Sequence, residues 1–208
     1  MGVILSKLLK FKSRERFKTF PFLHKLKILL FFVLLVILYS CKINGSFQGL
    51  YSYYHSTKKA KPSLIEKYDI TKECQFENQK KVIVINHEDL KNCLKQNPKS
   101  LIYIWKPKCK SEFCYALNIV QNRCLQNDIE LFVVAEYYDA TLMDIDYLLK
   151  KPLFGIDVEY YNTNLTEKYL NLFVSGITSN QTIEGSFIYF IDGKYEKSFK
   201  KINEIDEL

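Results

Sequence analysis

The sequence is poor in residues that interrupt regular structure, with only 7 glycines and 5 prolines among 208 residues. Hydrophobic residues make up 48% of the chain and charged residues 25%. This composition excludes a disordered or collagen-like protein. Internal repeats and low-complexity blocks are also absent. The length therefore predicts one compact domain with ancillary segments.

Several motifs of common enzyme classes are missing: the phosphate loop G-x-x-x-x-G-K, the nucleophile elbow G-x-S-x-G and the zinc motif H-E-x-x-H. Histidine is scarce too, with three in the chain. A copper site built from closely spaced cysteines and a histidine remains a minor alternative, because His55 lies in a predicted tether and His87 opens a predicted helix. We expect neither a metal nor a cofactor.

A basic excess exists only in the N-terminal segment. The net charge is +7, and residues 1–41 carry eight basic groups and one acidic group. The remaining chain holds 22 basic and 22 acidic residues and is neutral. A neutral domain lacks the electrostatic footprint for a phosphate backbone, so we expect no nucleic-acid binding.

The apolar run at residues 28–39 is too short for a typical transmembrane helix, which needs about 20 residues. A run of twelve behind lysines is typical of a signal peptide. It ends in Leu38-Tyr39-Ser40-Cys41, which resembles the lipobox of bacterial lipoproteins. The resemblance implies that Cys41 is lipidated and that the protein is membrane-anchored in the bacterial cell envelope, outside the cytoplasm.

Two alternatives to a lipoprotein stay open. The first is an uncleaved signal anchor, in which Cys41 is an ordinary juxtamembrane cysteine. The second is an endoplasmic-reticulum protein, because the chain ends in Asp-Glu-Leu at 206–208 and has glycosylation triplets at Asn44, Asn164 and Asn180. We divide the chain into a signal peptide or anchor (1–40), a tether with an irregular lead-in (41–80) and a folded domain (81–208).

From residue 81 the hydrophobic pattern alternates between strands and helices. Strands are expected at 81–85, 101–105, 131–135, 156–160, 186–191 and 194–199. Helices are expected at 88–95, from Ser111 through Phe113 to Cys124, from Asp139 through Ile145 to Leu149, and at 166–174. Crossover helices require parallel strands, and the Asp-Gly pair at 192–193 predicts a final antiparallel hairpin. The expected class is α/β, with a mixed sheet and helices on both faces.

This order of elements over residues 81–200 resembles the thioredoxin fold. The most specific points are a strand that ends in Trp105, Cys109 four residues later, a helix at the cysteines and the final hairpin. The strand inserted near Ile156 is similar to one in exported thioredoxin-like lipoproteins and in peroxiredoxins. The resemblance implies redox chemistry at Cys109, which follows the carboxyl end of a parallel strand.

Three positions depart from the family pattern. The family has C-x-x-C, whereas Cys109 and Cys114 form C-x4-C. A buried acidic residue of many thioredoxins is replaced by Tyr103, and the usual cis-proline before the penultimate strand is replaced by Gly185 followed by Ser186. Gly185 either leaves the site open to substrates or marks an enzyme that has lost its activity.

Cys109 is the predicted nucleophile and Cys114 the resolving cysteine. A helix N-terminus and the flanking Lys108 and Lys110 would lower the pKa of Cys109. The leading interpretation is thiol–disulfide exchange with exported proteins or small thiols. A non-catalytic binding or scaffold domain with a static disulfide is the main alternative, and a thiol peroxidase that forms a sulfenic acid on Cys109 is a lesser one.

The other cysteines have simpler interpretations. Cys93 and Cys124 lie on apolar helix faces, where small buried residues are common. Cys74 is a possible partner for Cys93, although spacing alone does not decide connectivity. Glu136 and Asp139 follow a strand at its carboxyl end, a position from which they could assist proton transfer near Cys109. The simpler interpretations are a solvated surface role for Glu136 and a helix cap for Asp139.

Overall fold

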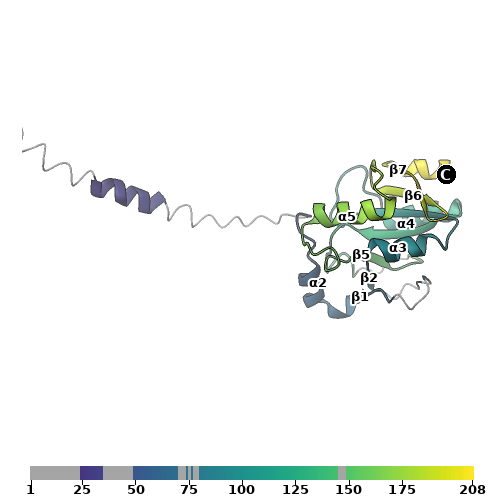
Figure 1. Cartoon of the computed structure of the whole chain (residues 1–208), viewed down its shortest axis with the longest axis horizontal. Helices are drawn as coiled ribbons and strands as arrows, with labels where there is room; N and C mark the ends of the chain where they lie inside the picture. Colours follow the sequence, from purple (N-terminus) through teal and green to yellow (C-terminus); the bar gives the residue numbers. More distant parts are fainter. Residues whose placement is uncertain (1–23, 35–48, 70–73, 75, 77–79, 145–148) are drawn as a thin grey trace, which may run out of the picture. The chain divides into compact units, whose positions relative to one another are not determined.

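The computed structural model describes residues 24–34 and 49–208, except 70–73, 75, 77–79 and 145–148 (Figure 1). The chain divides into two units, residues 1–46 and Phe47–Leu208. Residues 24–34 of the first unit are helical. Among the described residues, no helix combines the length and apolar character needed to cross a membrane. The lipobox and Cys41 lie outside the described residues.

The second unit begins with regular structure where the sequence predicted an irregular lead-in. Helix α2 (Tyr54–Ala60) and the 3-10 turn η1 (Pro62–Leu64) precede strand β1 (Ile65–Lys67). Strand β1 pairs in parallel with the next strand and so extends the sheet at one edge. The buried side chain of Tyr54 packs edge-on against Tyr138, which fixes α2 to the body of the domain.

The sheet has seven strands in the order β1-β2-β5-β4-β3-β6-β7. Strands β1 to β5 pair in parallel with one another, and β6 pairs antiparallel with both β3 and β7. The predicted mixed α/β sheet with a terminal hairpin is confirmed. The strands after β1 are β2 (Val82–Ile85), β3 (Lys99–Trp105), β4 (Glu130–Ala135), β5 (Leu153–Ile156), β6 (Phe187–Ile191) and β7 (Lys194–Phe199).

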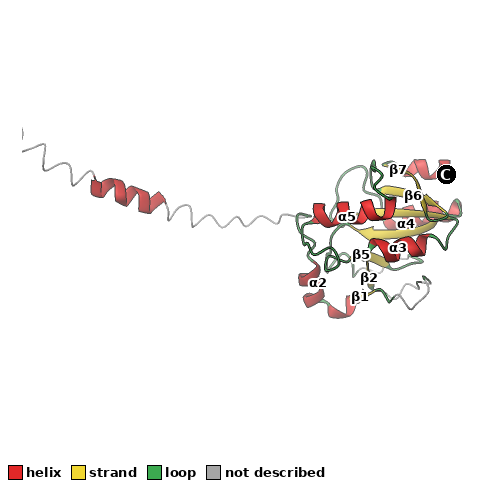
Figure 2. Cartoon of the chain, in the orientation of Figure 1, coloured by secondary structure: helices red, strands yellow, loops and turns green. Residues whose placement is uncertain are grey.

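Helices cover both faces of this sheet. Helices α3 (His87–Leu94) and α5 (Thr166–Thr178) pack against each other and lie in front of the sheet in Figure 2. Helix α4 (Leu117–Gln126) lies behind the sheet, against β4 and the C-terminal 3-10 turn η2 (Ile202–Glu207). Strand β3 lies inside the sheet between β4 and β6, and its residues from Ser100 to Trp105 are buried, so it forms a rigid base for the segment that follows it.

The fourth crossover strand lies earlier than expected, at Leu153–Ile156 instead of 156–160. Asp157 ends it, because its Oδ1 accepts hydrogen bonds from the N–H groups of Glu159 and Tyr160 and forms a turn. The strand is fully buried between β2 and β4. Gly155 is required there, since a Cβ would lie 2.4 Å from the hydroxyl oxygen of Tyr138.

The helix predicted from Asp139 to Leu149 is not observed where the chain is described. Residues 140–144 form turns, and Ile145 lies outside the described residues. The Oδ1 of Asp139 does accept hydrogen bonds from the N–H groups of Thr141 and Leu142, which is the geometry of a cap. The cap therefore begins a turn that does not continue as an α-helix within 140–144.

Candidate functional site

Cys109 and Cys114 form a disulfide in the segment between β3 and α4, with their Cα atoms 5.9 Å apart. Both residues are half-buried. Helix α4 begins only at Leu117, so the predicted helix start at Ser111 is wrong. The side chain of Phe113, expected on the buried stripe, is 37% exposed. A cross-link over five residues holds this segment in turns, and these turns delay the helix.

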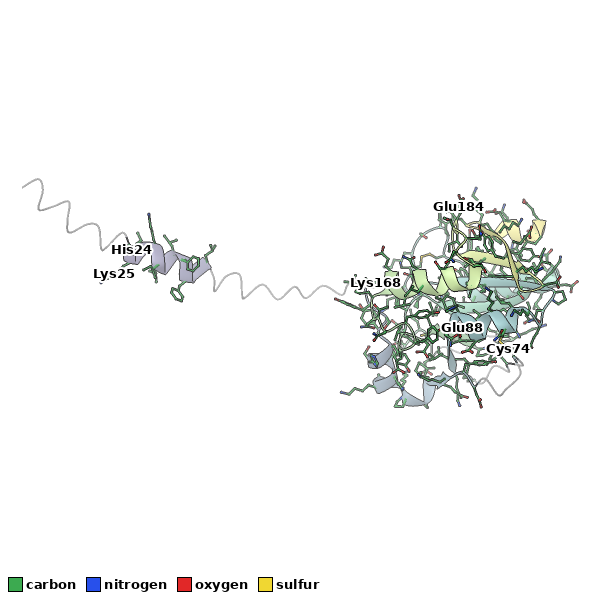
Figure 3. The ribbon with its side chains drawn as sticks, viewed as in Figure 1. His24, Lys25, Cys74, Glu88, Lys168 and Glu184 are labelled. Carbon is green, nitrogen blue, oxygen red and sulfur yellow. A yellow bond between two sulfur atoms is a disulfide. The ribbon has the colours of Figure 1, made fainter. Side chains whose placement is uncertain are left out.

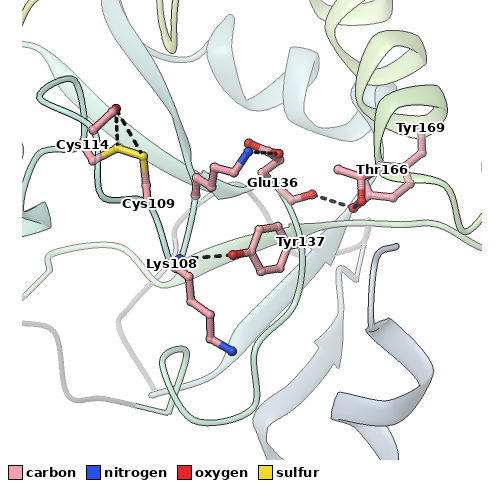
Figure 4. A network of polar contacts seen from close by, with 9 residues as sticks. Lys108, Cys109, Cys114, Glu136, Tyr137, Thr166 and Tyr169 are labelled. Carbon is pink, nitrogen blue, oxygen red and sulfur yellow. Dashed lines mark hydrogen bonds and ion pairs between the residues drawn. A yellow bond between two sulfur atoms is a disulfide. The ribbon is translucent and has the colours of Figure 1, made fainter. Parts of the chain in front are cut away.

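The late start of α4 removes one predicted source of thiolate stabilisation. The helix field acts mainly within the first turn, whereas Cys109 precedes the helix start by eight positions. The effect of a second source, the positive charge of Lys108, on the Cys109 thiolate is reduced by a nearby carboxylate. The Nζ of Lys108 lies 2.8 Å from Oδ2 of Asp139, and the hydrogen bond to that carboxylate raises the pKa of Lys108. The Lys108 side chain points away from the disulfide (Figure 4).

The disulfide forms part of the wall of a pocket of about 380 Å³. This volume is within the usual range for small-molecule sites. The pocket unites the cysteine segment with α5, with the segment before β6 and with the residue after β7. Its lining residues are Tyr103, Ile104, Lys106, Cys109, Ser111, Phe113, Cys114, Glu136, Leu170, Asn171, Val174, Ile183, Gly185, Ser186 and Lys200.

Gly185 lies beside the cysteines in this pocket, so the structure brings three predicted site residues together. Its φ is +98°, and a Cβ at this position would lie 2.3 Å from the carbonyl oxygen of Phe199. Only glycine fits without a backbone shift. The next residue, Ser186, accepts a hydrogen bond of 2.8 Å from the N–H of Ile104. This bond ties the Gly185 segment to the end of β3.

Trp105 and Tyr103 are fixed by the sheet and have different environments. Trp105 is buried and does not line the pocket. Tyr103 lines the pocket, and its ring stacks on Phe187 at a centroid distance of 4.7 Å. Burial raises the pKa of Tyr103, so its phenol stays protonated at neutral pH and does not replace the acidic residue of many thioredoxins.

Ser111 is a site residue that sequence reasoning interpreted only as a helix cap. Its hydroxyl oxygen lies 3.0 Å from Sγ of Cys114 and 3.5 Å from Sγ of Cys109 (Figure 4). The sulfurs of a disulfide carry no proton, so the hydroxyl is the donor. A serine between two cysteines of a C-x4-C pair is the only sequence signal for this role.

The predicted acidic neighbours are held by lysines. Glu136 lines the pocket, and its Oε1 lies 3.1 Å from Nζ of Lys106. Partial burial alone would raise the pKa of Asp139, but hydrogen bonds from Lys108 and from backbone N–H groups lower it. The Asp139 carboxyl group is thus stabilised as an anion. Glu136 is the carboxyl group that reaches the pocket.

The three other cysteines that the structure describes do not line the pocket. Cys74 (labelled in Figure 3) forms a disulfide with Cys93, and their Cα atoms are 5.3 Å apart. The pair is buried, with Cys93 fully inaccessible. Cys124 is a free, buried thiol, as the sequence indicated, and burial raises its pKa to about 12. Cys41 lies outside the described residues.

The histidines of the second unit have local partners. The ring of His55 contacts Tyr54, and Nδ1 of His87 lies 2.8 Å from the hydroxyl of Tyr161. Over the described residues, no group of three or more His, Cys, Asp or Glu side chains is arranged to hold a metal ion. The chemical groups concentrated at the pocket are therefore the disulfide, the Ser111 hydroxyl and the paired Glu136.

This arrangement can support nucleophilic attack on a disulfide. A thiolate that enters the pocket reaches a half-buried disulfide, and a hydroxyl donor is already beside the sulfur that would leave. The other disulfide is buried and offers no such access. Comparison of the chain with protein-family models, with curated proteins and with solved structures found no match.

Proposed function

We propose that this protein is a thioredoxin-like thiol–disulfide exchange protein that acts through Cys109 and Cys114. The observation that carries the proposal is the position of their disulfide in the wall of a pocket of about 380 Å³, directly after strand β3. The buried Cys74–Cys93 pair provides a contrast within the same domain. A half-buried disulfide at a pocket is open to exchange, whereas a buried disulfide elsewhere in the domain is suited to a structural role.

The arrangement of strands supports the thioredoxin-like part of the proposal. The cysteine segment follows a strand that has a parallel neighbour, β4, on one side and the antiparallel pair β6 and β7 on the other. Parallel crossover strands with a final antiparallel hairpin are what the family resemblance implies. Strand β5 between β2 and β4 would be an insertion relative to minimal thioredoxin.

In the reducing direction, the thiolate of Cys109 attacks a client disulfide, forms a mixed disulfide and releases one client thiolate. The thiolate of Cys114 then attacks Sγ of Cys109, and the second client sulfur leaves as a thiolate. Two electrons pass from the cysteine pair to the client, which takes up two protons as its thiolates become thiols. A dithiol donor must afterwards reduce the pair. The same steps in reverse oxidise a client dithiol, and a disulfide donor then restores the pair.

The pocket lining is compatible with exported proteins or small thiols as clients. Leu170, Val174 and Ile183 supply aliphatic surface, and Lys200 supplies a positive charge among the lining residues. Apolar walls with a few polar groups are typical of sites that bury part of a ligand. An extended client segment would reach the disulfide between α5 and the Gly185 segment, which both line the pocket.

The proposed location is the bacterial cell envelope, with a lipid on Cys41 as the membrane anchor. The support is the lipobox-like sequence after a basic and apolar segment. Changing Cys41 to Ala should release the protein from membranes. Unchanged membrane retention of this variant, with the front segment intact, would instead favour an uncleaved signal anchor.

The test is a redox titration of the domain from Ser46 onward, with the Cys109–Cys114 pair followed by alkylation and peptide mass. A reversible transition between about −120 and −270 mV, the range of known exchange catalysts, is the expected result. A pair that stays oxidised below about −300 mV, or that never forms a disulfide, would contradict the proposal.

One observation favours a second function, a binding or scaffold domain with a static disulfide. Cys109 lacks the helix N-terminus, and Lys108 is paired with Asp139, so two of the expected stabilisers of a thiolate are missing. The titration separates the two functions, because a static disulfide resists reduction by ordinary thiol buffers. In that case the pocket would serve as a binding site without electron transfer.

A further inference from the structure

Two tyrosine hydroxyls hold the backbone of the cysteine segment from opposite ends. The N–H of Lys108, next to Cys109, donates to the hydroxyl oxygen of Tyr137 at 3.2 Å (Figure 4). The N–H of Tyr115, next to Cys114, donates to the hydroxyl oxygen of Tyr103 at 3.1 Å. Each anchored N–H thus belongs to a direct neighbour of one of the two cysteines.

Both tyrosines are rigidly placed, so their hydroxyls are fixed points. Tyr103 is a residue of strand β3, and its ring stacks on Phe187. Tyr137 follows β4, is buried, and its ring meets Tyr53 of the lead-in edge-on at a centroid distance of 6.2 Å. The anchors therefore come from the sheet core on one side and from the packed lead-in on the other.

We propose that the hydroxyls of Tyr103 and Tyr137 are positioning groups that keep Cys109 and Cys114 close enough to close their disulfide. The inference rests on the proposed exchange function. In a C-x-x-C site the helix start holds both cysteines, but here α4 begins three residues after Cys114. The two tyrosine hydroxyls supply the missing constraint, since each fixes one end of an otherwise irregular segment.

The proposal predicts the direction of a redox effect. In the reduced protein, a segment held at both ends loses little further freedom when the sulfurs join. Without one anchor, the reduced segment samples more conformations, while the disulfide form stays cross-linked. In ring closure, the protein dithiol reacts with an oxidised thiol buffer and yields the protein disulfide and two buffer thiols. The equilibrium constant of this reaction, the ring-closure constant, must then fall.

Tyr137→Phe and Tyr103→Phe test this, because each removes one hydroxyl and retains the ring that packs. Tyr137→Phe removes the bond from the N–H of Lys108. Tyr103→Phe removes the bond from the N–H of Tyr115 and a longer one, of 3.5 Å, that the Tyr103 hydroxyl donates to the carbonyl oxygen of Tyr115. We expect each variant to lower the ring-closure constant about threefold to tenfold, the range of an ordinary hydrogen bond. For this two-electron couple, the midpoint potential becomes less negative by about 15 to 30 mV. The double variant should show the sum of the two shifts.

Tyr161→Phe is the matched control. Its hydroxyl oxygen also accepts a backbone N–H, that of His87 at 3.1 Å, but it serves α3, which follows β2. In the sheet, β2 is separated from β3 by β5 and β4. The ring-closure constant of the control should equal that of the wild type. An unchanged constant in both test variants, or an equal change in the control, would overturn the proposal.

Amide hydrogen exchange provides a readout that does not depend on the proposed function. The N–H of Lys108 should exchange faster in Tyr137→Phe, and the N–H of Tyr115 faster in Tyr103→Phe. Unchanged protection would refute the positioning role even if the pair cycles. If the wild-type pair lies outside the range of exchange catalysts, the exchange function fails, and ring-closure constants in strong dithiol buffer still decide the positioning role.

Discussion

The hydroxyl of Ser111 lies closer to Sγ of Cys114, at 3.0 Å, than to Sγ of Cys109, at 3.5 Å. This asymmetry distinguishes the two sulfurs of one disulfide. When an incoming thiolate attacks Cys109, Cys114 leaves as a thiolate, and the hydroxyl donor stabilises the developing charge. The arrangement therefore favours Cys109 as the attacked sulfur, in agreement with its predicted role as the nucleophile of the reverse reaction.

Replacing Ser111 with Ala should slow the reduction of the disulfide by dithiothreitol about threefold to tenfold. A hydrogen bond to a charged group contributes about 1.5 to 3 kcal/mol, and water at this half-buried site offsets part of the loss. Stopped-flow reduction kinetics would measure the effect. Ser111→Thr keeps the hydroxyl and should retain most of the rate. Equal rates in wild type and Ser111→Ala would show that the hydroxyl does not assist the leaving sulfur.

Replacement of Cys109 and replacement of Cys114 should affect client reduction in different ways. Cys109→Ser removes the nucleophile and should reduce insulin-disulfide reduction to the uncatalysed rate with the fold intact. Cys114→Ser leaves the nucleophile but removes the resolving thiol, so a mixed disulfide with the client should accumulate and be visible by intact mass. Full activity of Cys109→Ser would remove this residue from the mechanism.

Local sequence patterns were sufficient to predict the buried strands, one helix face and the tight turn. Runs of β-branched and aliphatic residues predicted β2, β3 and β4 within two residues of their bounds, because buried parallel strands need little else. The Asp-Gly pair at 192–193 also predicted the final hairpin from local sequence alone, because these two residues readily adopt the positive φ that a tight hairpin turn needs. Leu90, Cys93 and Leu94 are buried on α3 as their spacing indicated.

The errors arise where tertiary contacts override local preference. Ser111 is a good cap, yet its hydroxyl contacts two sulfurs, and α4 begins only at Leu117. The segment at 54–67 has no clear hydrophobic period, but Tyr54 finds a partner in Tyr138 and orders α2. The pocket also depends on α5, which no sequence spacing relates to the cysteines, whereas Gly185 was assigned to the site only through the family resemblance.

Gly185 should not tolerate substitution. Gly185→Ala places a Cβ 2.3 Å from the carbonyl oxygen of Phe199 and forces a non-glycine residue to φ +98°. We expect a loss of about 1 to 3 kcal/mol in the free energy of unfolding, measured by urea denaturation. Ser186→Ala at the next position keeps its backbone contact and serves as the control. Equal stability of Gly185→Ala and the wild type would mean that this segment adapts freely.

The Cys74–Cys93 disulfide should stabilise the domain without affecting exchange. The two cysteines are 19 residues apart, and a loop of this length contributes about 3 kcal/mol by restricting the unfolded chain. The double variant Cys74→Ala, Cys93→Ala should lose about this amount in urea denaturation and keep its insulin-reduction rate at a temperature where it is folded. Lost activity in a folded double variant would assign the buried pair a redox role.

Cys124 should be unreactive in the native protein although it is a free thiol. Burial raises its pKa from 9.0 to about 12, so at pH 8 its thiolate fraction is roughly a thousandfold below that of the unfolded chain. Because the folded state binds the proton more tightly, this residue contributes stability that is present below pH 9 and is lost as the pH rises towards 12.

The measurement for Cys124 is the alkylation rate at pH 8 with iodoacetamide, in native protein and in urea, with peptide mass to identify the site. Modification should require unfolding, so the native rate should increase with sub-denaturing urea. Between pH 9 and 12, the free energy of unfolding should decrease less in Cys124→Ala than in the wild type, because the variant lacks the thiol whose proton the folded state holds tightly. Rapid alkylation of Cys124 in the folded domain would contradict its burial on the inner face of α4.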